Sequence, residues 1–204
     1  MTAPVPTLRG LVIGDDPDAW RAAGFTVTGD MLTVGGVTIH LAGSDGERGI
    51  RGWWLDGAVA ADADGLAHVP TPPAPVAEVD HANHVTGVDH VVAGTPDIDR
   101  TTAALAELGV HPRRTATGVR GRGATYRFFL LRTALLEVIA PAEVDADADG
   151  PARFSGLAFV GDPDRLGAFG SPARDAIQPG RRIATIETRE WDISVPLAVM
   201  SPRP

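Results

Sequence analysis

The chain has 204 residues, a formal net charge of −8 at pH 7 and no cysteine. The negative charge argues against a nucleic-acid partner, because phosphates attract a basic surface. The absence of cysteine excludes disulfides, thiolate nucleophiles and cysteine-ligated zinc, and the absence of lysine excludes Schiff-base chemistry.

The first residues lack the basic and apolar regions of a signal peptide, and no apolar run is long enough to span a bilayer. We therefore expect a cytoplasmic protein with no membrane partner.

A first unit opens with a strand at 11–13 that breaks at Gly14 and an Asp-Asp-Pro-Asp sequence. The pattern predicts a short helix at 18–23, followed by strands near 25–28, 31–34 and 37–42. Residues 50–57 resemble the opening of a further unit, with Trp53 and Trp54 on one strand, but no helix follows them.

A second unit begins with the valine-rich strand 88–93, which breaks at Gly94-Thr95-Pro96-Asp97. Thr95 or Asp97 can cap a helix that ends at Gly109. Strands are then predicted near 113–117, 125–131 and 134–139. A third unit breaks at Gly161, and a helix near 164–169 and strands near 182–187 and 194–200 follow.

The breaking glycines at 14, 94 and 161 lie 80 and 67 residues apart, each at a junction rich in proline and aspartate. This recurrence indicates repeated βαβββ modules. We predict a reduced module at 1–67, a Pro-rich linker at 68–86 and a domain at 87–204 that pairs module 87–141 with module 153–204.

One helix and a few strands cannot bury both faces of a sheet, so such modules should pair. The expected fold is α+β, in which paired βαβββ modules form a cupped mixed sheet with helices on the outer faces. The sheet of 1–67 would be completed by the Trp53 strand, by the other domain or by a second chain, which would make the protein a homodimer.

His90 and Glu137 each stand among apolar residues on strands of the second module. We expect His90 to share a face with Val88 and Val92, and Glu137 to share one with Leu135 and Ile139. An imidazole and a carboxylate can bind a divalent metal ion, and they can equally hydrogen-bond each other in a partly wet cleft.

Val-Asp-His-Val-Val, the following Thr-Pro-Asp-Ile-Asp, and Leu-Leu-Glu-Val-Ile-Ala-Pro at 135–141 resemble the vicinal oxygen chelate superfamily. Its members include glyoxalase I, bleomycin-resistance proteins and extradiol dioxygenases. Residues 174–186 are similar to the end of glyoxalase-like domain proteins. The resemblance implies a ligand cup and metal ligands on the first and last strand of each module, the positions of His90 and Glu137.

In the third module the corresponding positions are Leu157 and Ala198, so two of the ligands that the resemblance implies are missing. We therefore expect at most a weakly held Zn, Fe, Mn or Ni ion.

Three further residues are assigned to ligand binding. If Tyr126, Phe128 and Leu130 face the helix, then Arg127 and Phe129 face the cup, where the guanidinium can hold an anionic group. Arg182 is a similar candidate in the third module. His81 and His84, just before the second module, are expected to be exposed.

Three functions stay open at this point. The first is a metal-assisted lyase, isomerase or dioxygenase acting on a small oxygenated substrate. The second, which we favour because ligands are missing, is a small-molecule-binding protein with no assigned enzymatic activity. The third is a dimerising interaction protein. The sequence identifies neither the ligand, nor a reaction, nor the oligomeric state.

Overall fold

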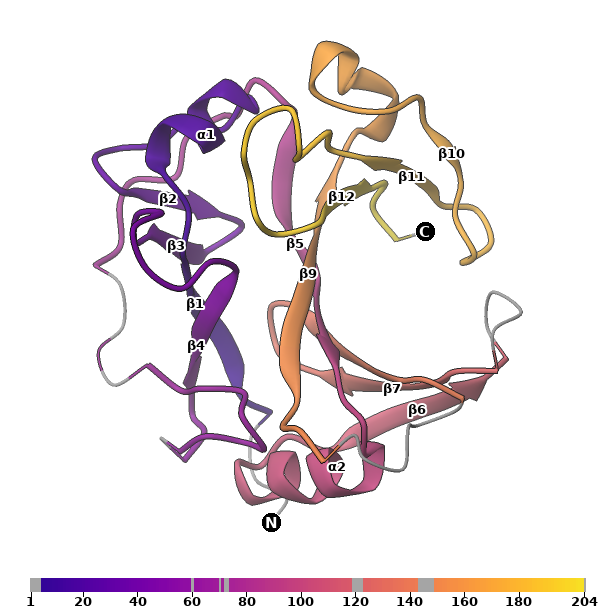
Figure 1. Cartoon of the computed structure of the whole chain (residues 1–204). Helices are drawn as coiled ribbons and strands as arrows, with labels where there is room; N and C mark the ends of the chain where they lie inside the picture. The colour runs from indigo at the N-terminus through magenta and orange to yellow at the C-terminus, as the bar shows by residue number, and fades with distance from the viewer. Residues whose placement is uncertain are drawn as a thin grey trace.

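The computed structural model describes residues 5–59, 61–69, 71, 74–118, 123–142 and 149–203. They form a four-stranded sheet of the order β2-β3-β1-β4 and an eight-stranded sheet of the order β10-β11-β12-β9-β5-β8-β7-β6 (Figure 1). No helix within the described ranges is long and apolar enough to cross a membrane.

The small sheet is built from the first unit and the strand after it. Its elements are β1 (Thr7–Ile13), α1 (Pro17–Ala22), β2 (Met31–Val34), β3 (Val37–Leu41) and β4 (Ile50–Asp56). β3 runs parallel to β1, and β4 pairs with the other edge of β1 in antiparallel register. The strand that carries Trp53 therefore completes this sheet.

The large sheet consists of two modules. The first contains β5 (Val85–Gly94), α2 (Ile98–Glu107), β6 (Pro112–Thr117), β7 (Thr125–Leu130) and β8 (Leu135–Ala140). The second contains β9 (Arg153–Gly161), the 3-10 turns η2 (Pro163–Arg165) and η3 (Gly167–Phe169), β10 (Arg174–Asp175), β11 (Arg182–Thr185) and β12 (Leu197–Met200). In each module the first strand runs parallel to the last, as β5 does to β8 and β9 to β12.

The two modules meet where β5 and β9 pair in antiparallel register. His90 lies opposite Ala158, and Val91 lies opposite Leu157. Gly94 and Gly161 are 67 residues apart, and by the same offset His90 corresponds to Leu157 and Val91 to Ala158. Replacing each residue of one pair by its counterpart in the other module therefore gives the other pair. The modules are therefore related by a local two-fold, and the fold is the predicted α+β arrangement of cupped modules.

An aspartate caps the first turn after each opening strand. Asp16 and Asp162 each accept a hydrogen bond from the backbone N–H two residues on, directly before a proline at the first helical position. Asp97 accepts from two backbone N–H groups at the start of α2. Such caps satisfy donors that a helix leaves unpaired, which explains the recurring sequence at the three junctions. The third junction yields 3-10 turns where an α-helix was expected.

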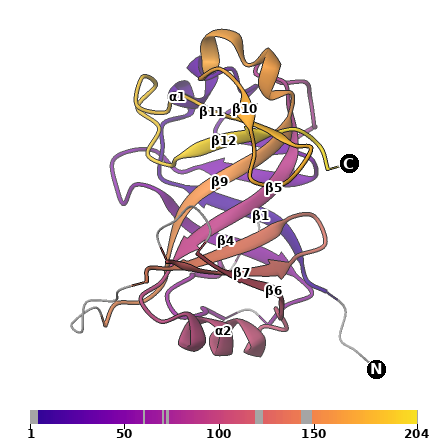
Figure 2. The same ribbon diagram turned by 90° about the vertical axis from the view of Figure 1, so that its right-hand side faces the viewer.

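The large sheet curls so that β6 and β7 face β10, β11 and β12 (Figure 1), and residues of all these strands line the hollow between them. Helix α2 lies beneath β6 and β7, on the side away from the hollow (Figure 2). The small sheet stands behind β5 and β9 on their other side.

Aromatic rings join the small sheet to the back of β9. The Phe25 and Trp20 rings lie 5.2 Å and 6.5 Å from the Phe159 ring, and Trp53 lies 5.2 Å from Phe154. Buried residues from both sheets belong to one apolar cluster. The same chain therefore covers the apolar face of the small sheet, and a homodimer stays a prediction.

The Asp15 carboxylate adds a polar tie between the first unit and the last. Asp15 is fully buried and accepts hydrogen bonds from Trp20 Nε1 (3.1 Å), Ser194 N (3.1 Å) and Ser194 Oγ (2.6 Å). Arg48 Nη2 lies 3.2 Å from the same carboxylate. The predicted division at 68–86 stays a prediction, and residues 70, 72 and 73 of that linker lie outside the described ranges.

His81 lies in this linker, and the expectation that it is exposed is wrong. It is 5 % exposed, accepts a hydrogen bond from Thr26 N at Nδ1 (3.0 Å) and approaches Thr33 O with Nε2 (3.2 Å). Burial lowers the pKa of His81, although the Thr33 carbonyl and the charges of Glu78 and Asp80 act in the opposite direction. A neutral imidazole therefore ties the linker to the small sheet.

We predict that this histidine makes folding sensitive to acid. Because its folded-state pKa is lowered, the unfolded chain binds a proton that the folded protein does not, once the pH falls below the unfolded pKa of about 6.5. The free energy of unfolding should fall as the pH drops below about 6.5. Urea unfolding should show this slope in the wild type and in the exposed control His111→Gln, and a smaller slope in His81→Gln. An unchanged slope in His81→Gln would contradict the assignment.

Candidate functional site

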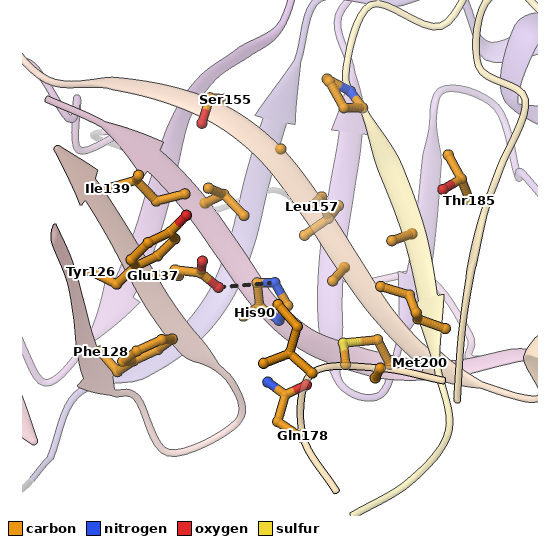
Figure 3. A pocket seen from close by; sticks show the side chains of 18 of the residues that line it. His90, Tyr126, Phe128, Glu137, Ile139, Ser155, Leu157, Gln178, Thr185 and Met200 are labelled. Carbon is orange, nitrogen blue, oxygen red and sulfur yellow. Dashed lines mark ion pairs between the residues drawn. The ribbon is translucent and has the colours of Figure 1, made fainter. Parts of the chain in front are cut away.

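The hollow of the large sheet is a cavity of about 430 Å³ (Figure 3). All eight strands of the large sheet contribute to its walls, together with the hairpin between β10 and β11. Most of the lining is apolar, and His90, Tyr126 and Glu137 bring polar groups into one side. We call this cavity the cup.

A β-bulge in β5 decides which side chains reach the site. The register shifts between Val88 and His90, so that the intervening Asp89 has no partner of its own on β9. Val88 is buried in the apolar core, whereas the consecutive residues Asp89 and His90 both line a cavity on the opposite side. The expectation that Val88 shares a face with His90 is wrong, because a bulge breaks strict alternation.

Asp89 fixes the orientation of His90. Its Oδ2 lies 2.8 Å from His90 Nδ1, and its Oδ1 accepts from Arg181 Nη2 at 2.7 Å. Burial would raise the pKa of the Asp89 carboxyl, but the hydrogen bonds and charges of His90 and Arg181 outweigh it and hold that pKa well below its usual range. Asp89 is thus an ionised acceptor, so the proton sits on His90 Nδ1.

The second nitrogen of His90 faces Glu137. Nε2 lies 3.5 Å from Glu137 Oε2, an ion-pair distance, and both side chains are largely buried (Figure 3). Because Nδ1 is engaged by Asp89, Nε2 is the nitrogen that His90 directs toward Glu137 and the cup. The structure thus brings together the two predicted site residues.

The predicted orientation of β7 is reversed. Tyr126 and Phe128 line the cup, and Phe128 lies directly opposite Glu137 on β8. Phe129 is fully buried in the core, so its assignment to the ligand site is wrong. Both faces of this strand carry an aromatic residue, and alternation alone does not show which face meets the helix.

Arg127 likewise points away from the cup. Its guanidinium contacts α2, through Thr102 Oγ1 at 2.8 Å, Ile98 O at 3.2 Å and Asp99 at 2.7 Å. The predicted ligand-binding role of Arg127 is therefore replaced by one of holding the first turn of α2 against β7.

Arg182 is also outside the site. It pairs with Asp164 (2.8 Å) and Asp175 (3.3 Å), and 41 % of its side chain is exposed. Its neighbour Arg181 is the buried one, with 3 % of its side chain exposed, and it donates to Ser201 O as well as to Asp89. The two adjacent arginines at the start of β11 are the sequence signal that could have revealed it. Consecutive residues of an extended segment face opposite sides, so one of the two is expected to point inward.

The positions of the third module that correspond to His90 and Glu137 carry side chains without donor atoms. Leu157 and Ala198 line the cup there, as the alignment of the modules predicts. Among the described residues, no group of three or more histidine, aspartate or glutamate side chains is placed to hold a metal ion. His90 and Glu137 therefore provide two donors. Other described side chains do not bring the number to the three or four that a tightly bound metal ion needs.

Paired βαβββ modules, with parallel first and last strands around one cup, define the architecture. The fold is glyoxalase-like. The resemblance seen in the sequence is confirmed at the level of the fold. No model of a known protein family matches this sequence, and no curated protein matches it.

Among solved structures, methylmalonyl-CoA epimerase from Mycobacterium tuberculosis is 20% identical, with a TM-score of 0.47, and the match covers 60% of this chain and 91% of that one. A variant of the Streptomyces coelicolor methylmalonyl-CoA epimerase, in complex with 2-nitronate-propionyl-CoA, is 16% identical (TM-score 0.47; 59% and 99% covered). Hypothetical protein BH1468 from Bacillus halodurans is 12% identical (TM-score 0.45; 57% and 94% covered). The assignment of the glyoxalase-like fold rests on the topology described above.

We predict that the Asp89–Arg181 pair is required for stability. Both side chains are 3 % exposed, and breaking a buried ion pair by removing one partner costs about 3–5 kcal/mol. Arg181→Met should lower the free energy of unfolding by roughly that amount. The adjacent Arg182→Met, which removes exposed ion pairs, should cost about 1 kcal/mol or less. Equal losses in urea unfolding would contradict this prediction.

Proposed function

We propose that the protein binds a small organic molecule in the cup. The observation that carries the proposal is a preformed cavity of about 430 Å³ whose walls are mostly apolar and which holds a few convergent polar groups. Ligand sites have this composition, because apolar walls supply affinity and polar groups fix orientation. The exposed side chain of Ile177 lies at the cup and offers further apolar surface to an entering molecule.

Within the cup, the ligand would lie between two unlike walls. Leu157, Ala198 and Met200 form an apolar wall, and His90 and Glu137 stand on the polar one. A carbonyl or hydroxyl group of the ligand would turn toward His90 Nε2, the nitrogen that Asp89 leaves to the cup. The proposal is one of binding, and it assigns no reaction.

A metal-assisted reaction on a small oxygenated substrate is the second candidate. It is favoured by one observation, the orientation of His90 by a carboxylate at Nδ1, an arrangement found at metal-ligating histidines. A divalent ion would polarise a carbonyl oxygen or stabilise an enolate. His90 and Glu137 would be its protein donors, and oxygen atoms of the ligand would have to complete the shell.

Filling the cup should weaken binding. We use 1-aminoanthracene, a neutral aromatic probe whose fluorescence rises in apolar surroundings. Ala198→Phe adds a ring inside the cavity and should weaken probe binding by about tenfold or more. Ala103→Phe adds the same bulk on the exposed face of α2 and should bind like the wild type. Wild-type protein that does not bind the probe, or equal binding by both variants, would contradict the proposal.

The metal candidate is tested by heating the protein with and without added Zn, Mn or Fe at neutral pH. Two protein donors should give only a weak effect, about 1–3 °C in Tm at millimolar ion. His90→Ala and Glu137→Gln should each remove this effect. The control His111→Ala should keep it, because His111 is exposed and does not line the cup. No response in the wild type would leave binding without metal as the function.

A further inference from the structure

A second cavity of about 440 Å³ adjoins the cup. The two cavities share a boundary, because six residues line both of them: His90, Arg114, Phe128, Glu137, Gln178 and Pro179. The hairpin between β10 and β11 runs along both, with Ile177 on the cup and Arg181 on the second cavity. A ligand that fills the cup can therefore extend into the second cavity past His90 and Glu137.

Four arginine side chains line this second cavity, which we call the arginine vestibule. They are Arg113, Arg114, Arg181 and Arg203. The chain as a whole carries a net charge of −8, so a cavity lined by four guanidinium groups is more positive than the protein as a whole. The two carboxylates that line the vestibule, Asp89 and Glu137, leave a local excess of positive charge.

Two β-bulges build the vestibule. In β5 the bulge at Asp89 turns two consecutive residues into it, as described above. In β6 the register shifts between Pro112 and Arg114, and the consecutive residues Arg113 and Arg114 both line the same cavity. Bulges re-aim side chains at binding sites, and here two of them, on different strands, direct charged groups to one place.

The arginines differ in how far their charge is already compensated. Arg181 is neutralised by Asp89 at 2.7 Å, and Arg203 approaches the same carboxylate at 3.7 Å with 53 % of its side chain exposed. Arg113 and Arg114 have no carboxylate within 4.0 Å among the described residues, and Arg114 lies 5.9 Å from the centroid of the Phe128 ring. Their charges are thus available to a ligand.

We infer that the ligand is an amphipathic organic anion, with its apolar body in the cup and a carboxylate in the arginine vestibule. A guanidinium matches a carboxylate with two parallel hydrogen bonds, and the apolar wall around Leu157 and Ala198 accepts the body. The atoms next to the carboxylate would then lie beside His90 and Glu137. This inference rests on the proposed function of the cup.

The test compares two probes that differ in their head group. Octanoate and 1-octanol are each allowed to displace 1-aminoanthracene from the full-length protein. We expect octanoate to bind the wild type at least about tenfold more tightly than 1-octanol. Arg113→Gln/Arg114→Gln should lose most of this preference, measured as the ratio of the octanoate and 1-octanol affinities of the same variant.

The matched control is Arg165→Gln/Arg189→Gln, which changes the net charge equally at exposed arginines outside both cavities. It should keep the preference for octanoate. An octanoate affinity no greater than that of 1-octanol, or a preference that survives Arg113→Gln/Arg114→Gln, would overturn the inference. In either case, 1-aminoanthracene that still binds the wild type and not Ala198→Phe would leave the proposed function standing, whereas failure of that binding would remove both.

Discussion

The buried carboxylate of Asp89 connects the parts of the site. One oxygen holds His90 in a single tautomer, and the other anchors Arg181 at the base of the hairpin that lines both cavities. Because Asp89 and Arg181 are both buried, each charge would be costly without the other. The position of the hairpin, the direction of His90 Nε2 and the shape of the cavities thus depend on one ion pair.

The antiparallel pairing of β5 with β9 sets the larger frame. It joins the two modules edge to edge across a local two-fold, so that their strands form one continuous curved sheet. The inner side of that surface is the cup. The outer side is apolar and is covered by α2 at one end and by the small sheet behind β9, with Phe159 packed against Phe25 and Trp20. The inner side is left open to a ligand.

The parts of this arrangement that could be predicted are those with a local cause. Aspartate caps beside proline recur at three strand ends, and they reveal the modules because a cap depends only on its neighbours in sequence. His90 and Glu137 were found because polar residues stand out in apolar strands. The bulge at Asp89 and the phase of β7 could not be predicted, because each depends on a neighbouring strand or helix. The phase of β7 explains why Arg127 and Phe129 were misplaced. Arg182 was chosen in place of its neighbour Arg181 because the two adjacent arginines do not show by sequence which of them is buried.

The central claim is that the inner face of the curved sheet is a ligand site. Backbone amide chemical shifts of the full-length protein, followed during titration with 1-aminoanthracene, test it most directly. The account predicts that the shifted amides gather on β5, β7, β9 and β12 around Val92, Phe128, Gly156 and Ala198, and that the small sheet stays unchanged. Shifts concentrated on the small sheet or at its contact with β9, or none at saturating probe, would contradict it.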